Sequence, residues 1–253
     1  MPDPCSFLSG PGPARRRMKI MRVHRLKGLV IAAAIAAAPW IVEANPARAD
    51  DTAPAAVDAA AAKKLYLRRS CIACHGKDGQ KAIQDYPALA GQRADYMVAQ
   101  IEDILSGKRV GSPDASGNPR AKGMRGALVA PDGSRRITED EVKAISGWLA
   151  TLAPPPIEAV ATPLEPDKAT AAAAMFAEKC EACHGAAGRE PLEGYPRIAG
   201  QKHVYVLAQM KDIKSKARSN GQSEAMQTIL DDVSDADMEL LAAFVSAQEP
   251  IAK

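Results

Sequence analysis

Two short stretches of this sequence combine residues that could do chemistry: CIACH at 71–75 and CEACH at 180–184. Two thiols and an imidazole at this spacing can hold zinc, exchange disulfides with other thiols, or attach a haem covalently. These are the chemistries of three different classes of protein. The sequence around the motifs has to decide among them.

Zinc and thiol chemistry account poorly for these motifs. A four-cysteine zinc site built from both pairs would leave His75 and His184 without a role, and a site within one motif is strained because its histidine directly follows the second cysteine. A thioredoxin-like motif follows a strand in a βαβ unit. Here alanine-rich, helix-favouring sequence leads into each pair of cysteines.

Covalent haem attachment explains the spacing directly. Two thiols within one turn of chain can add to the two vinyl groups of a porphyrin, and the adjacent histidine is then held beneath the iron as an axial ligand. Two motifs therefore predict two covalently bound c-type haems. The predicted attachment residues are Cys71, Cys74, Cys180 and Cys183, and the predicted iron ligands are His75 and His184.

The chain is an internal duplication. A shift of 109 residues aligns 71–109 with 180–218 without a gap. Such a match predicts two similar units, each with its own site. Beyond the motifs, the matching pairs are Tyr86-Pro87 with Tyr195-Pro196, Ala90-Gly91-Gln92 with Ala199-Gly200-Gln201, Tyr96 with Tyr205, Gln100 with Gln209, and Arg109 with Arg218.

Helical patterns dominate both copies, and aromatic residues are few. The closing segments 137–152 and 233–248 each place apolar residues along one face, and Thr138 with Glu141 forms a capping-box pattern. We therefore predict an all-α fold of two tandem domains, each wrapped around one haem. Helices are also predicted over 57–70, 92–105, 168–179 and the stretch containing Tyr205, Met210 and Ile213.

The N-terminal 49 residues have the pattern of an export signal. Basic residues precede an apolar run from Gly28 to Val42, and ARAD at 47–50 offers a cleavage site after Ala49. An uncleaved anchor is the alternative, although the run is short for a membrane span and contains Pro39. Without residues 1–49 the chain has 25 basic and 28 acidic residues, which gives no indication of a nucleic-acid partner.

The predicted boundaries follow from the repeat and from proline content. The segment 154–167 is rich in proline and reads as a semi-rigid linker. The predicted order is a signal peptide at 1–49, a first domain at 50–153, this linker, and a second domain at 168–253. The closing helices align at a shift of 96, so the first copy has 13 extra residues, assigned to Gly/Pro-rich stretches at 111–119 and 130–136.

A second axial ligand should recur downstream of both motifs. Met124 and Met226 each lie between the second helix and the closing helix, in segments that we predict to be irregular. Histidine/methionine ligation is expected for carrier cytochromes, so we predict these two methionines as ligands, with unpaired surface methionines as the alternative. The remaining methionines after the leader, Met97, Met175, Met210 and Met238, are interpreted as core.

The repeated order of CXXCHG, YP, AGQ, methionine and closing helix resembles the class I c-type cytochromes, and its tandem form is similar to the dihaem periplasmic carriers of the cytochrome c-four type. The resemblance covers nearly all of 55–250. It implies that the carbonyls of Pro87 and Pro196 receive the ring N–H of His75 and His184. It also implies haem-edge packing by Tyr86, Leu89, Tyr195 and Ile198, and propionate contacts by Arg109 and Arg218.

These features predict a periplasmic electron carrier rather than an enzyme. Filled axial positions allow one-electron exchange and leave no open site for a substrate. The expected partners are redox proteins such as a respiratory complex, a terminal oxidase or a dehydrogenase. Binding to them is expected to be transient, and some of them are membrane complexes. Two alternatives remain: an electron-accepting subunit of a dehydrogenase complex, with the extra residues of copy one as a docking surface, and a dihaem enzyme such as a peroxidase.

Overall fold

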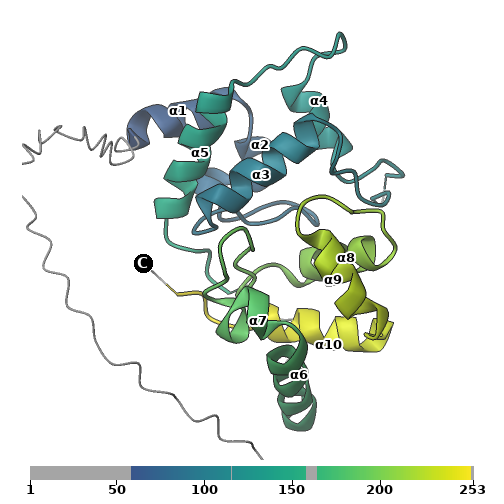
Figure 1. Ribbon diagram of the computed structural model, residues 1–253. Coiled ribbons are helices and arrows are strands. Elements are labelled where there is room, and N and C mark those ends of the chain that lie inside the picture. Colours follow the sequence, from purple (N-terminus) through teal and green to yellow (C-terminus); the bar gives the residue numbers. More distant parts are fainter. Residues whose placement is uncertain (1–57, 115, 158–163, 252–253) are drawn as a thin grey trace, which may run out of the picture. The chain divides into compact units, whose positions relative to one another are not determined.

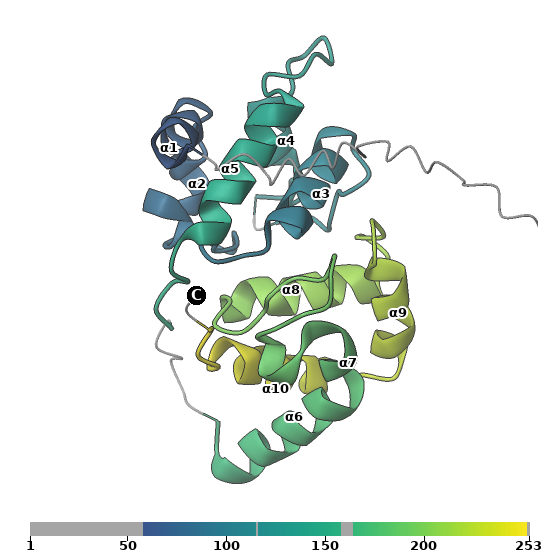
Figure 2. The same ribbon diagram turned by 60° about the vertical axis from the view of Figure 1, so that its left-hand side comes forward.

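The computed structural model describes residues 58–114, 116–157 and 164–251. Two domains follow one another, each built from helices (Figures 1 and 2). Domain one contains α1 (Ala59–Arg68), α2 (Ile72–His75), η1 (Lys77–Gly79), α3 (Ala94–Leu105), α4 (Lys122–Leu128) and α5 (Glu139–Thr151). Domain two contains α6 (Pro166–Lys179), α7 (Glu181–His184), η2 (Ala186–Gly188), α8 (His203–Lys214), α9 (Ser223–Asp231) and α10 (Asp235–Ser246).

The predicted all-α class is confirmed. Within the described ranges, β pairing is limited to isolated bridges between Pro113 and Pro119 and between Val129 and Arg135. Each of these bridges closes a turn in one of the two stretches that carry the extra residues of domain one. The predicted linker 154–167 lies partly outside the described residues, and the domain boundaries stay predictions.

Local sequence fixes where the closing helices begin. The Thr138 hydroxyl accepts the Glu141 N–H while the Glu141 carboxylate accepts the Thr138 N–H, so the capping box predicted from the sequence is present at the start of α5. At the start of α10 the Ser234 hydroxyl accepts the Asp237 N–H. These caps satisfy backbone donors that a helix leaves unpaired at its first turn.

The closing helix forms the centre of each domain. In domain one, α5 packs against α1 and α3, and Trp148 meets Tyr66 edge-on with ring centroids 5.4 Å apart. In domain two, α10 packs against α6 and α8, as Figures 1 and 2 show, and Phe244 meets Phe176 at 5.5 Å. A compact helical core therefore supports one side of each CXXCH motif.

The prediction that the segments around the two methionines are irregular was wrong. Met124 lies on α4 and Met226 lies on α9. Gly123 and Gly126 made the sequence of α4 unlike that of a helix, because glycine is among the poorest helix formers. Packing supplies what propensity lacks: each methionine precedes a buried leucine by four residues, and both members of the pair therefore share one helix face.

The predicted signal peptide at 1–49 lies outside the described residues. In the ranges that the structure describes, no helix has both the length and the apolar character needed to cross a bilayer.

Candidate haem-binding sites

Each Cys-x-x-Cys-His motif forms a single helical turn at the end of a longer helix. The four cysteines of the motifs are free thiols and partly exposed. Burial raises the pKa of Cys71 to about 11 and that of Cys180 to about 11, so both are neutral thiols near pH 7. The predicted attachment residues thus lie within one turn of their histidine in both domains.

A glycine directly after each histidine turns the chain away. Gly76 and Gly185 have φ angles of +72° and +71°. A Cβ at either position would lie 2.2 Å from a backbone oxygen, that of Lys81 or that of Glu190. Only glycine permits this turn, which returns the chain toward the histidine.

Both histidines are held in one tautomer. The Nδ1 of His75 lies 3.0 Å from the Pro87 carbonyl oxygen, and the Nδ1 of His184 lies 3.2 Å from that of Pro196. A carbonyl only accepts hydrogen bonds, so Nδ1 is the donor and the lone pair stays on Nε2. Burial lowers the pKa of both histidines, which favours the neutral form that binds metals.

The motifs open into a cavity with largely apolar walls that runs between both domains. The two predicted methionine ligands line the same cavity as the two histidines. The residues predicted to pack at the haem edges line it too. All the predicted site residues of both domains therefore line one cavity: Cys71, Cys74, His75, Tyr86, Pro87, Leu89 and Met124 from the first domain, and Cys180, Cys183, His184, Tyr195, Pro196, Ile198 and Met226 from the second.

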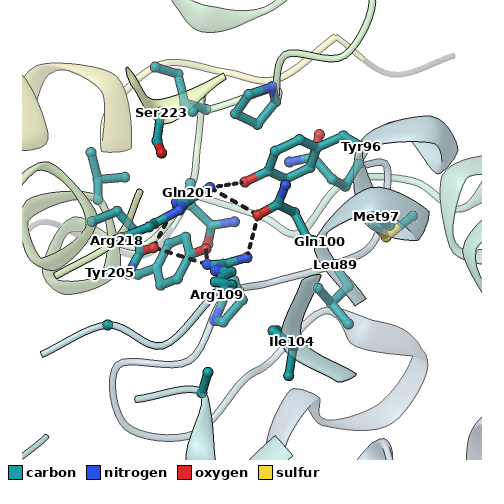
Figure 3. A pocket seen from close by; sticks show the side chains of 18 of the residues that line it. Leu89, Tyr96, Met97, Gln100, Ile104, Arg109, Gln201, Tyr205, Arg218 and Ser223 are labelled. Atoms are coloured by element: carbon teal, nitrogen blue, oxygen red, sulfur yellow. Dashed lines mark hydrogen bonds between the residues drawn. The ribbon is translucent and has the colours of Figure 1, made fainter. Parts of the chain in front are cut away.

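Two arginines reach into this cavity from opposite domains, as Figure 3 shows. The guanidinium of Arg109 donates to the Gln209 and Tyr205 side chains of domain two at 3.0 Å. The Arg218 guanidinium donates to Gln100 and Tyr96 of domain one, at 3.0 and 3.2 Å. The exchange is reciprocal, because each residue of one set aligns with its counterpart at the repeat shift of 109.

These arginines bind neutral side chains rather than carboxylates. Arg218 is only 7% exposed, and no carboxylate of the described residues forms a salt bridge with it or with Arg109. Burial alone would raise the pKa of Tyr96, yet the charges of the two arginines outweigh it and lower that pKa. One buried and one half-buried arginine, both hydrogen-bonded to neutral side chains, fit a dianionic cofactor whose carboxylates would pair with their charge.

The residues present therefore fit the cofactor predicted from the motifs. Each domain supplies two thiols for attachment, an imidazole with a free Nε2, and apolar walls, and the cavity supplies positive charge between the domains. This fold and these sites define an all-α protein with two covalent haem sites.

Comparison with known families leads to the same class. The Cytochrome c family profile matches residues 59–153 and again 169–249. The chain belongs to the cytochrome c family, and its two domains with their two motifs carry two covalent c-type haems for electron transfer.

Several related proteins match most of this chain and most of their own length. Cytochrome c4 of Azotobacter vinelandii is 29% identical over 180 residues, covering 69% of this chain and 82% of that protein. A "thiosulfate dehydrogenase electron acceptor" of Stutzerimonas stutzeri is 26% identical over 74% of this chain and 85% of its own. The crystal structure of reduced cytochrome c4 from Pseudomonas stutzeri matches with a TM-score of 0.59 and 25% identity, over 77% of this chain and all of that one.

Sequence reasoning missed the residues that join the two domains. Lys202 is buried and donates from Nζ to the backbone carbonyls of Ala82 and Gln84. The buried carboxylate of Asp212 accepts from the Ser112 hydroxyl of domain one. The repeated AGQ sequence was the available signal. A glutamine on the surface would have no reason to recur in both copies, so its recurrence indicates a contact. The spacing does not show which residues the glutamines contact.

Proposed function

We propose that this protein carries single electrons between larger redox proteins in the periplasm, through two haems with histidine/methionine ligation, and that it catalyses no reaction of its own. The observation that carries the proposal is the histidine–proline contact found in both domains. It leaves Nε2 of a buried, neutral imidazole available in a cavity that a methionine also lines.

In this proposal the ligands are His75 and Met124 in domain one and His184 and Met226 in domain two. The thiols of both motifs form the thioether links, and the carbonyls of Pro87 and Pro196 orient the imidazoles. A haem with both axial positions filled changes its charge by one electron with little rearrangement. The chain keeps the imidazole proton on Nδ1, holds the ring in place and excludes water from the apolar walls.

Export supports the periplasmic location. Residues 1–49 have the composition of a signal peptide, and covalent c-type haem is attached outside the cytoplasm. The four thiols of the motifs are unpaired, which suits attachment of haem in a compartment where disulfides otherwise form.

The test is a redox titration of the purified holoprotein followed by optical absorption. The proposal predicts two low-spin haems per chain, each with a methionine–iron charge-transfer band in the oxidised state, and no carbon monoxide binding by the reduced protein. Peroxide turnover by the purified protein, or a high-spin haem in the resting state, would overturn it.

A second candidate function is the electron-accepting subunit of a dehydrogenase. It is supported by two relatives that carry the name "thiosulfate dehydrogenase electron acceptor", 26% and 29% identical to this chain. Purification from the native host separates the two functions. A free carrier elutes alone, whereas a subunit elutes with a larger catalytic chain whose substrate reduces both haems.

A further inference from the structure

Two buried glutamines, one from each domain, hold a backbone group of the other domain. The side-chain amide of Gln201 accepts the N–H of Ala88 at 3.0 Å and donates to the carbonyl of Ala88 at 2.9 Å. The amide of Gln92 accepts the N–H of Arg197 at 2.9 Å and donates to its carbonyl at 2.8 Å. Both glutamines are 8% exposed.

The backbone groups that they hold adjoin the predicted iron ligands. Ala88 follows Pro87, and the Ala88 N–H belongs to the same planar peptide group as the Pro87 carbonyl. That carbonyl accepts the Nδ1–H of His75. Gln201 and His75 therefore bind the two ends of one rigid peptide group, although they come from different domains.

The same arrangement exists in the opposite direction. The Arg197 N–H, which Gln92 holds, shares a peptide group with the Pro196 carbonyl, and that carbonyl accepts the Nδ1–H of His184. A hydrogen bond at one end of a peptide group polarises it and strengthens the bond at the other end. Each glutamine thus acts on the orientation and the basicity of a histidine in the other domain.

Each glutamine is itself held firmly on its own domain. The Gln201 oxygen also accepts the Lys202 N–H at 3.0 Å, and the Gln92 oxygen also accepts the Arg93 N–H at 2.9 Å. Two N–H groups facing one oxygen leave the amide a single favourable orientation.

The glycine before each glutamine anchors it to the closing helix. Gly91 donates its N–H to Leu149 of α5, and Gly200 donates to Val245 of α10, both at 2.9 Å. Gly91 has a φ of +73°, and a Cβ there would lie 2.9 Å from Pro154. A continuous path of contacts therefore links the closing helix of one domain to the predicted ligand of the other.

We propose that Gln92 and Gln201 are cross-domain positioning residues: each holds the proline peptide that orients the axial histidine of the opposite domain, so each haem's midpoint potential depends on its neighbour's glutamine. This inference rests on the proposed histidine ligation. It goes beyond it by making the docking of the domains a determinant of both potentials.

The test uses the holoprotein with Gln201→Leu and, separately, Gln92→Leu. In the reduced state, with ¹⁵N-labelled histidine, the Nδ1–H resonances of His75 and His184 report the two proline contacts. Gln201→Leu is expected to shift the His75 resonance, to speed its exchange with solvent by about fivefold, the loss of roughly one hydrogen bond, and to leave His184 unchanged. Gln92→Leu is expected to do the reverse.

Redox titration supplies the second readout. The haem at Cys71 and Cys74 should show the larger potential shift in Gln201→Leu, and the other haem the larger shift in Gln92→Leu. Gln201→Glu keeps the acceptor for the Ala88 N–H and serves if the leucine variant does not fold. The shift of the His75 resonance in Gln201→Glu should be smaller than the shift of the His184 resonance in Gln92→Leu, because the leucine removes both hydrogen bonds to the backbone of the other domain and the glutamate keeps one.

Ser112→Ala is the matched control, because it removes a hydrogen bond between the domains that does not touch either proline peptide. Both histidine resonances should stay in place in this variant. Equal movement of both resonances in Ser112→Ala, or movement only within the mutated glutamine's own domain, overturns the inference. A wild-type protein without low-spin, histidine-ligated haem overturns the proposed function instead.

Discussion

The two domains share their histidine side and differ on their methionine side. Both have the same turn after the motif, the same proline contact and the same closing helix, whereas the connection that carries the methionine differs in length and path. In domain two, α9 spans nine residues and follows α8 after residues 215–222, while in domain one the seven-residue α4 lies between two Gly/Pro-rich stretches.

The extra residues of domain one lie on both sides of α4 and serve different contacts. In the first stretch, Gly111 donates its N–H to the Ala217 carbonyl of domain two at 3.0 Å, and Ser112 binds Asp212. In the second stretch, Arg135 pairs with Glu102 of its own domain. Part of the surface that the sequence offered for an outside partner is thus used between the two domains. The extra residues flank α4, and Met124 lines the cavity as Met226 does.

The largest expected effect comes from removing either methionine. Met226→Ala and Met124→Ala should each open one iron to carbon monoxide and lower that haem's potential on the order of 0.1 V, within the roughly 0.8 V that axial ligands span. Optical titration with carbon monoxide measures both variants. Met238→Leu, a change in the core of domain two, is the control and should bind none. If the wild-type protein bound carbon monoxide at the haem of domain one and not at that of domain two, Met124 would be a labile ligand.

Replacing the shared arginines should affect both domains together. Arg218→Gln and Arg109→Gln each remove a positive charge that favours the reduced haem, so both potentials should fall by an amount on the order of tens of millivolts. Arg218→Lys and Arg109→Lys keep the charge and should retain most of the potential. A fall confined to one haem would show that the arginine belongs to one site and not to the boundary between the two.

The closing helices offer a comparison of stability. Glu141 caps α5 and also binds Arg69 at 2.6 Å, whereas Asp237 of α10 has the capping contact with Ser234 and no salt bridge among the described residues. Glu141→Gln should therefore lower the free energy of unfolding by about 1 kcal/mol, and Asp237→Asn by less. Chemical denaturation of the holoprotein measures both.

The pH dependence should distinguish the same pair. The hydrogen bond from Arg69 lowers the pKa of Glu141, with further help from the Thr138 N–H and Arg68. A carboxylate whose folded pKa is depressed contributes stability above its unfolded value of about 4.3, and this contribution is lost as the pH falls through the folded pKa. Glu141→Gln should therefore flatten the acid limb of the stability curve. An unchanged acid limb would mean that the arginine contact is absent in solution.

The smallest effect is expected at the second Gly/Pro-rich stretch. The pair between Arg135 and Glu102 is exposed, with side chains 40% and 34% accessible. Arg135→Gln should change the free energy of unfolding by about 0.5 kcal/mol or less and leave both potentials unaltered. A larger loss would indicate that this turn supports α4 and its methionine.

Much of the fold could be predicted from local patterns. The capping box of Thr138 and Glu141, the apolar faces of the closing helices and the duplication are all recorded in short spacings. The short α4 and α9 escaped prediction because a helix of two turns depends on tertiary packing more than on propensity. In α4 the two glycines disfavour a helix, so the local sequence predicts an irregular segment.

The candidate site divides in the same manner. The motif residues and the prolines follow from sequence and resemblance, and their predicted proximity agrees with the structure. The contacts of Gln92, Gln201 and Lys202 join residues more than 100 positions apart, and no local periodicity encodes such a pairing. The recurrence of the glutamine as Gln92 and Gln201 was a sign that this position matters, but only the three-dimensional structure shows what these side chains bind.

The reciprocity of the glutamine and arginine contacts has a consequence for how the chain came to hold together. A pairing in which residue i of one half meets residue j of the other, and j meets i, is the arrangement of a symmetric homodimer. Here the two halves belong to one chain, and a tether of this kind gives each half a local concentration on the order of millimolar beside the other. Reciprocal polar contacts between tethered halves can then stay closed without the affinity that free subunits would need, and the two sides are free to diverge, as Lys202 and its counterpart Arg93 have done.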